Sequence, residues 1–118
     1  MIDDDRLVAD TLAMILNTNG FDAVATYSGL DAVELARLAA YDNLLTDVMM
    51  EPMNGIEAAL AICSLRPACR VLLMSGNERT AALLKEAAGA GHDFEILAKP
   101  VHPTVILEHL RNSQLPAI

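Results

Sequence analysis

Two spacings of apolar residues alternate along the chain, one typical of amphipathic helices and one typical of buried strands. Leu7, Leu12 and Leu16 share one helical stripe, and Asn19-Gly20 then supplies a stop signal. The run 71–74 is apolar at every position, as expected for a strand buried on both faces. The pattern predicts helices at 6–19, 30–40, 55–66, 80–90 and 104–112, and strands at 21–26, 44–45 (ending at 46–47), 70–74 and 94–98.

The regular alternation of strand and helix predicts an α/β fold with a parallel sheet covered by helices on both faces. The chain has 118 residues, which fits one domain over residues 1–118. A strand should also precede the first helix, yet only Met1 and Ile2 stand before the acidic run 3–5. Either this first strand is a stub, or the sequence starts inside it.

Polar residues stand where the predicted strands end. The first strand ends in Asp3-Asp4-Asp5, the next ones in Asp47 and Ser75, and the last in Lys99. Ligands of open α/β sheets bind at the carboxyl ends of the strands, so these groups are expected to converge. Crowded carboxylates repel one another, and a hard divalent cation such as Mg²⁺ relieves that repulsion. An aspartate can also accept a phosphoryl group, whose charge the metal and the lysine would neutralise.

Four short motifs resemble receiver domains of two-component response regulators, the CheY-like superfamily. They are the acidic cluster 3–5, Thr46-Asp47-Val48-Met49-Met50 with Pro52-Met53-Asn54-Gly55, Met74-Ser75-Gly76, and Lys99-Pro100. They occur in the family's order and span essentially the whole chain. The resemblance implies a flavodoxin-like, doubly wound sheet of five parallel strands in the order 2-1-3-4-5, which is the order known from that family.

The resemblance also implies roles for single residues. Asp47 would be the phosphoacceptor, Ser75 the switch hydroxyl and Lys99 a contact to the phosphoryl group. Mg²⁺ would be held by Asp3, Asp4, Asp47 and the backbone carbonyl of Met49, with Asp4 as a direct ligand. The phosphoryl donor would be a histidine kinase or a phosphotransfer protein. Such a protein is a phosphoacceptor rather than a turnover enzyme, with self-catalysed phosphorylation and dephosphorylation left open.

Departures from the family pattern keep a second hypothesis open. Glu51 stands where the family usually has proline, and Pro52 follows; Ile96 replaces a frequent aromatic residue, and Val101 a frequent phenylalanine. A receiver-like interaction module that is not phosphorylated is therefore the alternative. A phosphohydrolase with Asp47 as nucleophile is a weaker one, because Met49 stands where such enzymes typically have a second aspartate.

Composition narrows the class of partner. The net charge of −8 argues against sequence-independent binding of nucleic acid or an anionic membrane. The start of the chain lacks the features of a signal peptide, and no apolar run approaches the about 20 residues needed to span a bilayer. Cytoplasmic localisation is the resulting expectation. The downstream partner stays undefined, and a homodimer through the final helices stays open.

Several residues have simpler expected roles. Asp5 is a natural N-cap for the first helix, and Ser75 could cap the segment that follows it. Cys63 and Cys69 are too far apart for a CxxC pair and are expected to be reduced thiols. The three histidines fall on different elements, so they are expected at the surface or hydrogen-bonded rather than as metal ligands: His92, His102 and His109.

Overall fold

A computed structural model describes residues 1–76, 94–99 and 101–114. Its elements are, in chain order, α1 (Arg6–Thr18), α2 (Gly29–Leu38), β1 (Asn43–Asp47), α3 (Gly55–Leu65), β2 (Arg70–Ser75), β3 (Glu95–Ala98) and α5 (Pro103–Gln114). These agree with the sequence-based elements to within a few residues. The helix expected at 80–90 lies outside the described residues.

The three described strands form one parallel sheet in the order β1-β2-β3. Ile2 extends this arrangement, because it forms isolated parallel bridges with both Thr26 and Thr46. Ile2 is thus held between the chain around Thr26 and β1. The coarse prediction of a parallel sheet in an α/β fold is confirmed, whereas the five-stranded order 2-1-3-4-5 stays a prediction.

The strand predicted at 21–26 was wrong, since only Thr26 forms a bridge. Its pairing is irregular. Residues 1–3 bond this segment at Val24 and Thr26 through three backbone hydrogen bonds. On the opposite edge, the side chain of Asn17 accepts from the Ala23 N–H at 2.6 Å and donates to the Ala23 carbonyl at 3.1 Å.

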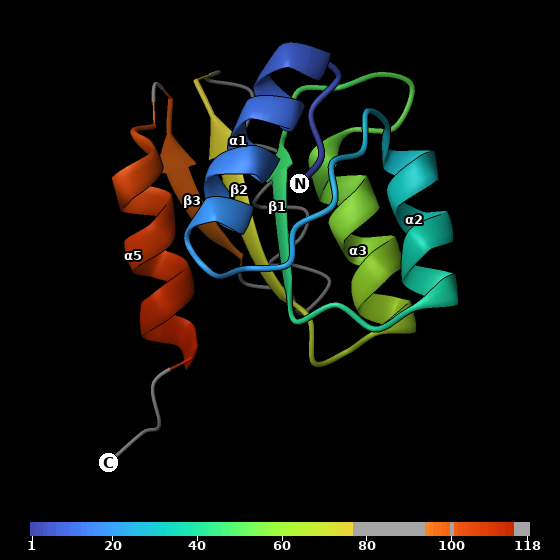
Figure 1. The fold of residues 1–118 in the computed structure, drawn as a ribbon. Helices are drawn as coiled ribbons and strands as arrows, with labels where there is room; N and C mark the ends of the chain where they lie inside the picture. The colour runs from blue at the N-terminus through green and yellow to red at the C-terminus, as the bar shows by residue number, and fades with distance from the viewer. Residues whose placement is uncertain (77–93, 100, 115–118) are drawn as a thin grey trace.

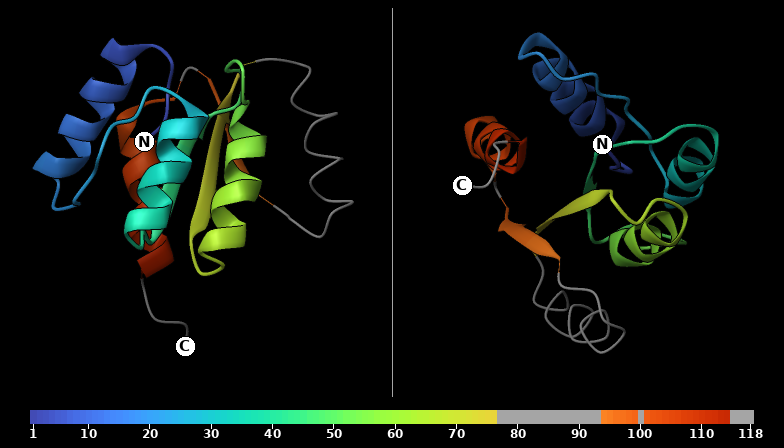
Figure 2. Two further views of the ribbon diagram at one scale, coloured as in Figure 1. Left: turned by 90° about the vertical axis from the view of Figure 1, so that its right-hand side faces the viewer. Right: turned by 90° about the horizontal axis from the view of Figure 1, so that it is seen from below.

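Helices cover both faces of the sheet, α1 and α5 on one face and α2 and α3 on the other (Figures 1 and 2). Neighbouring residues of β1 pack against opposite helix layers. Leu44 packs in a cluster with residues of α2 and α3, whereas Leu45 packs with residues of α1 and α5. Each fully buried leucine contributes roughly 1.5–3 kcal/mol by leaving water, so both layers are anchored on this strand. None of the helices described is long and apolar enough to cross a membrane.

Candidate functional site

Three carboxylates meet at the carboxyl edge of the sheet. Asp47 is the last residue of β1, and its N–H donates to the carbonyl of Ile2 at 3.0 Å, which sets Asp3 beside it. Carboxylate oxygens of Asp3, Asp4 and Asp47 all lie within 4.8 Å of one another. Asp3 and Asp47 are buried, whereas Asp4 is exposed. The sheet therefore brings together acidic side chains from positions that are more than forty residues apart in the sequence.

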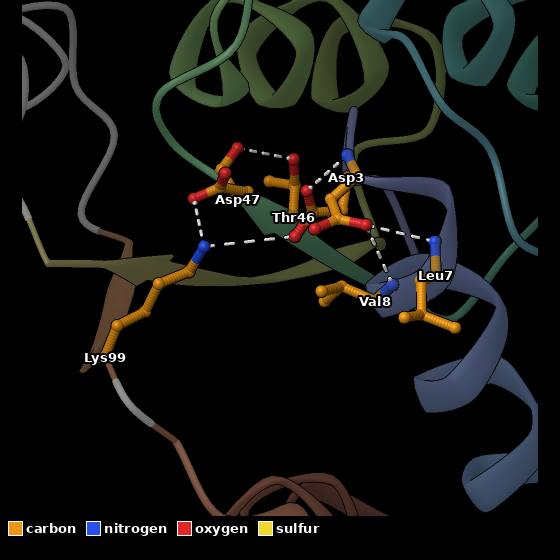
Figure 3. Close-up of polar contacts among 7 residues, drawn as sticks. Asp3, Leu7, Val8, Thr46, Asp47 and Lys99 are labelled. Atoms are coloured by element: carbon orange, nitrogen blue, oxygen red, sulfur yellow. Dashed lines mark hydrogen bonds and ion pairs between the residues drawn. The ribbon is translucent and has the colours of Figure 1, made fainter.

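Lys99 adds a positive charge from the other end of the chain. It follows β3, and its backbone N–H donates to the carbonyl of Ser75 at 2.9 Å, which fixes it at the same edge. Its Nζ lies 3.0 Å from Asp47 Oδ1 and 3.9 Å from Asp3 Oδ2 (Figure 3). The first distance is that of a charge-assisted hydrogen bond and the second is too long for one. Asp47 is thus directly paired, while Asp3 feels the ammonium only through its field.

Asp3 is the least satisfied group of the cluster. Its Oδ1 accepts a hydrogen bond from the Asp5 N–H at 2.9 Å, but its buried Oδ2 has no hydrogen-bond partner among the described residues. Burial raises the pKa of Asp3, and the charges of Asp47 and Asp4 raise it further; the Asp5 N–H and Lys99 lower it. A buried carboxylate oxygen that faces other carboxylates is a position where a cation would be stabilised.

The acidic run also starts the first helix. Asp5 is the N-cap of α1, since its Oδ1 accepts from the N–H groups of Leu7 at 3.1 Å and Val8 at 3.4 Å. The capping role expected for Asp5 is confirmed. Because Asp5 also donates its own N–H to Asp3, the site and the first turn of α1 form one hydrogen-bonded unit.

The segment after Asp47 is a loop, as predicted, and folds back against β1. Val48 donates its N–H to Met74 and accepts at its carbonyl from both Met50 and Gly55. The Glu51–Pro52 peptide bond within the loop is cis. Met49 lies half-buried in this loop, and its proposed role as a carbonyl ligand remains a prediction.

Two supporting residues were missed by sequence reasoning. A Cβ added to Gly55 would lie 2.1 Å from the Asp47 carbonyl oxygen, so only glycine allows this approach. Thr46 is fully buried and donates its hydroxyl to the same carbonyl at 2.9 Å. The fixed spacing from Asp47 to Gly55 was a usable signal for the glycine. The threonine has no comparable signal, because its contact depends on side-chain orientation.

Ser75 is placed next to the cluster by strand register. Asp47 pairs with Met74, and Ser75 is the following and last residue of β2. It is buried and pairs with Ala98, the residue before Lys99. Its hydroxyl is thus on a neighbouring strand end, and its role as the switch residue remains a prediction.

The donor set fits a hard divalent cation. Carboxylate oxygens are the ligands preferred by Mg²⁺, and the buried, unbonded Oδ2 of Asp3 is available for such an ion. Three negative charges against one lysine also leave the described cluster with an excess of negative charge. Mg²⁺ binding at Asp3, Asp4 and Asp47 is therefore chemically consistent with this geometry.

The remaining candidate groups lie elsewhere. Cys63 and Cys69 are free thiols, and burial raises the pKa of the Cys69 thiol to about 11, which makes it unreactive. Both described histidines are exposed. His102 Nδ1 accepts from the Thr104 N–H at 3.1 Å, and His109 lies 3.4 Å from Glu95. His92 lies outside the described residues.

Curated relatives align with most of this chain. The chain is 28% identical over 102 residues to the cell cycle transcriptional regulator CtrA of Caulobacter vibrioides, covering 86% of this chain and 43% of that protein. It is 33% identical over 108 residues to a response regulator receiver protein of Anaeromyxobacter sp., covering 92% and 44%. The chain thus spans less than half the length of these curated relatives.

Solved structures agree at the level of the fold. The CheY-like response regulator receiver domain protein from Methanospirillum hungatei superposes with a TM-score of 0.82 at 22% identity, covering 95% of this chain and 88% of that one. The family model described as the response regulator receiver domain matches residues 1–111, which include every residue of the acidic cluster, Ser75 and Lys99. The chain therefore belongs to the response regulator receiver domain family.

Proposed function

We propose that this protein is a phosphorylation-dependent switch that accepts a phosphoryl group on Asp47 from a histidine kinase or a phosphotransfer protein. Membership in the receiver family gives it a role in two-component signalling. The single observation that carries the proposal is the setting of the Asp47 carboxylate. It lies at a strand end between the Lys99 ammonium at 3.0 Å and the carboxylates of Asp3 and Asp4.

Phosphoryl transfer depends mainly on positioning the reacting groups and on neutralising the charge of the phosphoryl oxygens. A carboxylate oxygen of Asp47 attacks the phosphorus of a phosphohistidine, the new O–P bond forms, and the P–N bond breaks with its electrons left on the histidine nitrogen. Lys99 holds the attacking carboxylate through Oδ1 and offsets the negative charge brought by the incoming phosphoryl oxygens. The Thr46 hydroxyl bonds the Asp47 carbonyl and the Gly55 N–H bonds the Val48 carbonyl, and both fix the backbone around the nucleophile.

Asp3, Asp4, Asp47 and the carbonyl of Met49 are the proposed ligands of Mg²⁺. When bound, the ion would neutralise part of the charge on the phosphoryl oxygens. The protein's own contribution is to keep Asp3 and Asp47 buried and close together; the burial of Asp3, and then its repulsion by Asp47 and Asp4, raise the pKa of Asp3. A cation bound between these carboxylates would offset this unfavourable interaction.

Ser75 is the residue proposed to respond to phosphorylation of Asp47. Its hydroxyl would hydrogen-bond a phosphoryl oxygen and draw the end of β2 toward Asp47, since register places the two on adjacent strands. A two-state equilibrium of the protein would shift accordingly. The downstream partner would recognise the shifted state.

Intact mass spectrometry after incubation with Mg²⁺ and acetyl phosphate tests the proposal. We expect one phosphoryl adduct per chain in the wild type and none in Asp47→Asn. Asp5→Asn is the matched control, because asparagine also caps helices well and the adduct should persist. An adduct that survives in Asp47→Asn would disprove the assignment.

The alternative of an unphosphorylated interaction module is favoured by Glu51 and Ile96. Glu51 adds an exposed negative charge to the loop beside the site, and Ile96 is 40% exposed where the family often has an aromatic ring. Titration with Mg²⁺ separates the two functions. Saturable binding at millimolar Mg²⁺ supports the switch, whereas no binding and no adduct support the module.

A further inference from the structure

Arg6 forms no ion pair within the described part of the chain, although aspartates surround it in the sequence at positions 3–5 and 10. Two of these carboxylates are engaged elsewhere, since Asp5 caps α1 and Asp10 Oδ1 accepts from the Tyr27 hydroxyl. The Arg6 guanidinium lies over the Tyr27 ring, with its Cζ 4.3 Å from the ring centroid. This cation–π contact leaves the charge and the N–H donors of Arg6 available to an anion.

The position of Arg6 in its helix does not explain why a cation stands there. Arg6 is the first residue of α1, where a positive charge opposes the helix dipole. Apart from the N-cap Asp5, the first turn contains no acidic residue that would offset this charge. Departures from local preference are typical of functional sites. A role at the adjacent edge of the sheet therefore explains Arg6 better than stabilisation of the helix does.

Strand register places the Arg6–Tyr27 pair at the same edge as the acidic cluster. Ile2 forms parallel bridges with both Thr26 and Thr46, so the residues that follow these three stand at one level of the sheet. These following residues are Tyr27, Asp3 and Asp47. Neighbouring segments of a sheet are about 4.8 Å apart, so the backbones of Tyr27 and Asp47 are separated by about 10 Å.

The two cations flank the carboxylates from opposite sides. β2 and β3 follow β1 on the side away from Ile2, and Lys99 comes directly after β3. Arg6 stands over Tyr27 on the other side. Lys99 contacts Asp47 directly, whereas Arg6 is too far away for such a contact and acts on the site through its field.

The field of Arg6 matters because a phosphoryl donor is an anion. The described cluster sets three carboxylates against one lysine and therefore repels such a donor. A unit charge at about 10 Å in water changes the local concentration of an ion by about twofold per unit of the ion's charge. Salt weakens this effect, since the Debye length is about 10 Å at 0.1 M.

We propose that Arg6 is a further positioning residue of the phosphoryl-acceptor site, which attracts anionic phosphoryl donors toward Asp47 from the side opposite Lys99. The inference rests on the proposed function of Asp47. Tyr27 holds the guanidinium in place, and the bond of its hydroxyl to Asp10 holds the ring. The same charge repels a divalent cation at the acidic cluster. Arg6 thus favours the approach of the donor and disfavours binding of Mg²⁺, two effects of opposite sign.

Phosphorylation kinetics and Mg²⁺ titration of Arg6→Gln test the inference, with acetyl phosphate as the donor. In this reaction an Asp47 oxygen attacks the phosphorus, and the P–O bond to the acetyl group breaks with its electrons left on acetate. At low salt and saturating Mg²⁺ we expect the second-order rate constant to fall about two- to threefold, and Mg²⁺ to bind about two- to threefold more tightly. Both differences should nearly vanish at about 0.5 M salt.

The charge of the donor gives a further readout that structural damage would not produce. Phosphoramidate has a smaller net negative charge than acetyl phosphate at neutral pH, so its rate constant should fall less in Arg6→Gln. Arg6→Lys keeps the charge and should keep both quantities near their wild-type values. Arg37→Gln is the matched control, because it removes the same charge from the last turn of α2 and should change neither quantity.

Three outcomes would contradict this account. A parallel loss of rate and of Mg²⁺ affinity in Arg6→Gln would overturn the inference, because misplaced structure rather than charge would then be the cause. A wild-type rate and Mg²⁺ affinity retained by Arg6→Gln at low salt would also overturn the inference, and the inference alone. Wild-type protein that takes up no phosphoryl group would overturn the proposed function of Asp47 and this inference with it.

Discussion

Asp3 and Asp4 are neighbours in sequence with opposite surroundings. Asp3 is 2% exposed and has a buried oxygen without a hydrogen-bond partner among the described residues, while Asp4 is exposed. The raised pKa of Asp3 means that its environment disfavours the charged form. The negative charge that would bind a cation at Asp3 therefore lowers the stability of the folded protein when no cation is bound.

Asp3→Asn is expected to raise the free energy of unfolding in the absence of divalent cations, by about 0.5–2 kcal/mol at neutral pH. Asparagine keeps an oxygen that can accept from the Asp5 N–H and removes one of the mutually repelling charges. Mg²⁺ affinity should fall at the same time. Urea unfolding and Mg²⁺ titration measure the two effects.

Asp4→Asn is the matched control for that experiment. It should weaken Mg²⁺ binding as well but change stability by less than about 0.5 kcal/mol, because Asp4 is exposed. A clear loss of stability in Asp3→Asn would show that the Lys99 field outweighs the repulsion.

Gly55 and Gly29 give a second comparison at the scale of single residues. Both are the first residue of a helix, but an added Cβ meets different neighbours. At Gly55 it would lie 2.1 Å from a backbone oxygen, and at Gly29 2.8 Å from the flexible side chain of Met53. We expect Gly55→Ala to lose more than about 2 kcal/mol of stability and to impair adduct formation, and Gly29→Ala to lose about 1 kcal/mol or less. Similar losses in both variants would contradict this explanation.

At the scale of elements, the starts of the helices are set by capping residues next to them in the sequence. Asp5, Ser28 and Asn54 cap α1, α2 and α3, and Asn54 forms a capping box with Glu57. Such signals lie within a few residues of sequence, so helix starts could be predicted. The irregular segment at 21–26 could not, because its apolar residues suit a strand but its pairing depends on contacts with residues 1–3, far away in the sequence.

Asp5→Ala is expected to lower the free energy of unfolding by about 1 kcal/mol, since it removes the acceptor for the first N–H groups of α1. Asp5→Asn should be close to neutral because asparagine caps equally well. Chemical denaturation of the two variants measures the difference. Equal stability of Asp5→Ala and the wild type would mean that water replaces the cap.

At the scale of the whole molecule, the sequence was sufficient for the parallel sheet and its two helix layers. Unbroken apolar strands and alternating elements allow few other arrangements, and the same rule gathers the strand ends at one edge. The burial of Asp3 and the close approach of Gly55 to Asp47 could not be predicted. Both depend on distances between segments that only the folded chain defines.

Leu44 and Leu45, which bury toward opposite helix layers, make β1 intolerant of changes in length. Deleting one residue between Leu45 and Asp47 would turn the terminal carboxylate to the opposite face of the sheet. Inserting two residues would keep the carboxylate on its present face but move it beyond the reach of Lys99. The number of residues between Leu45 and Asp47 is therefore constrained, and we expect this part of β1 to tolerate substitutions but not insertions or deletions.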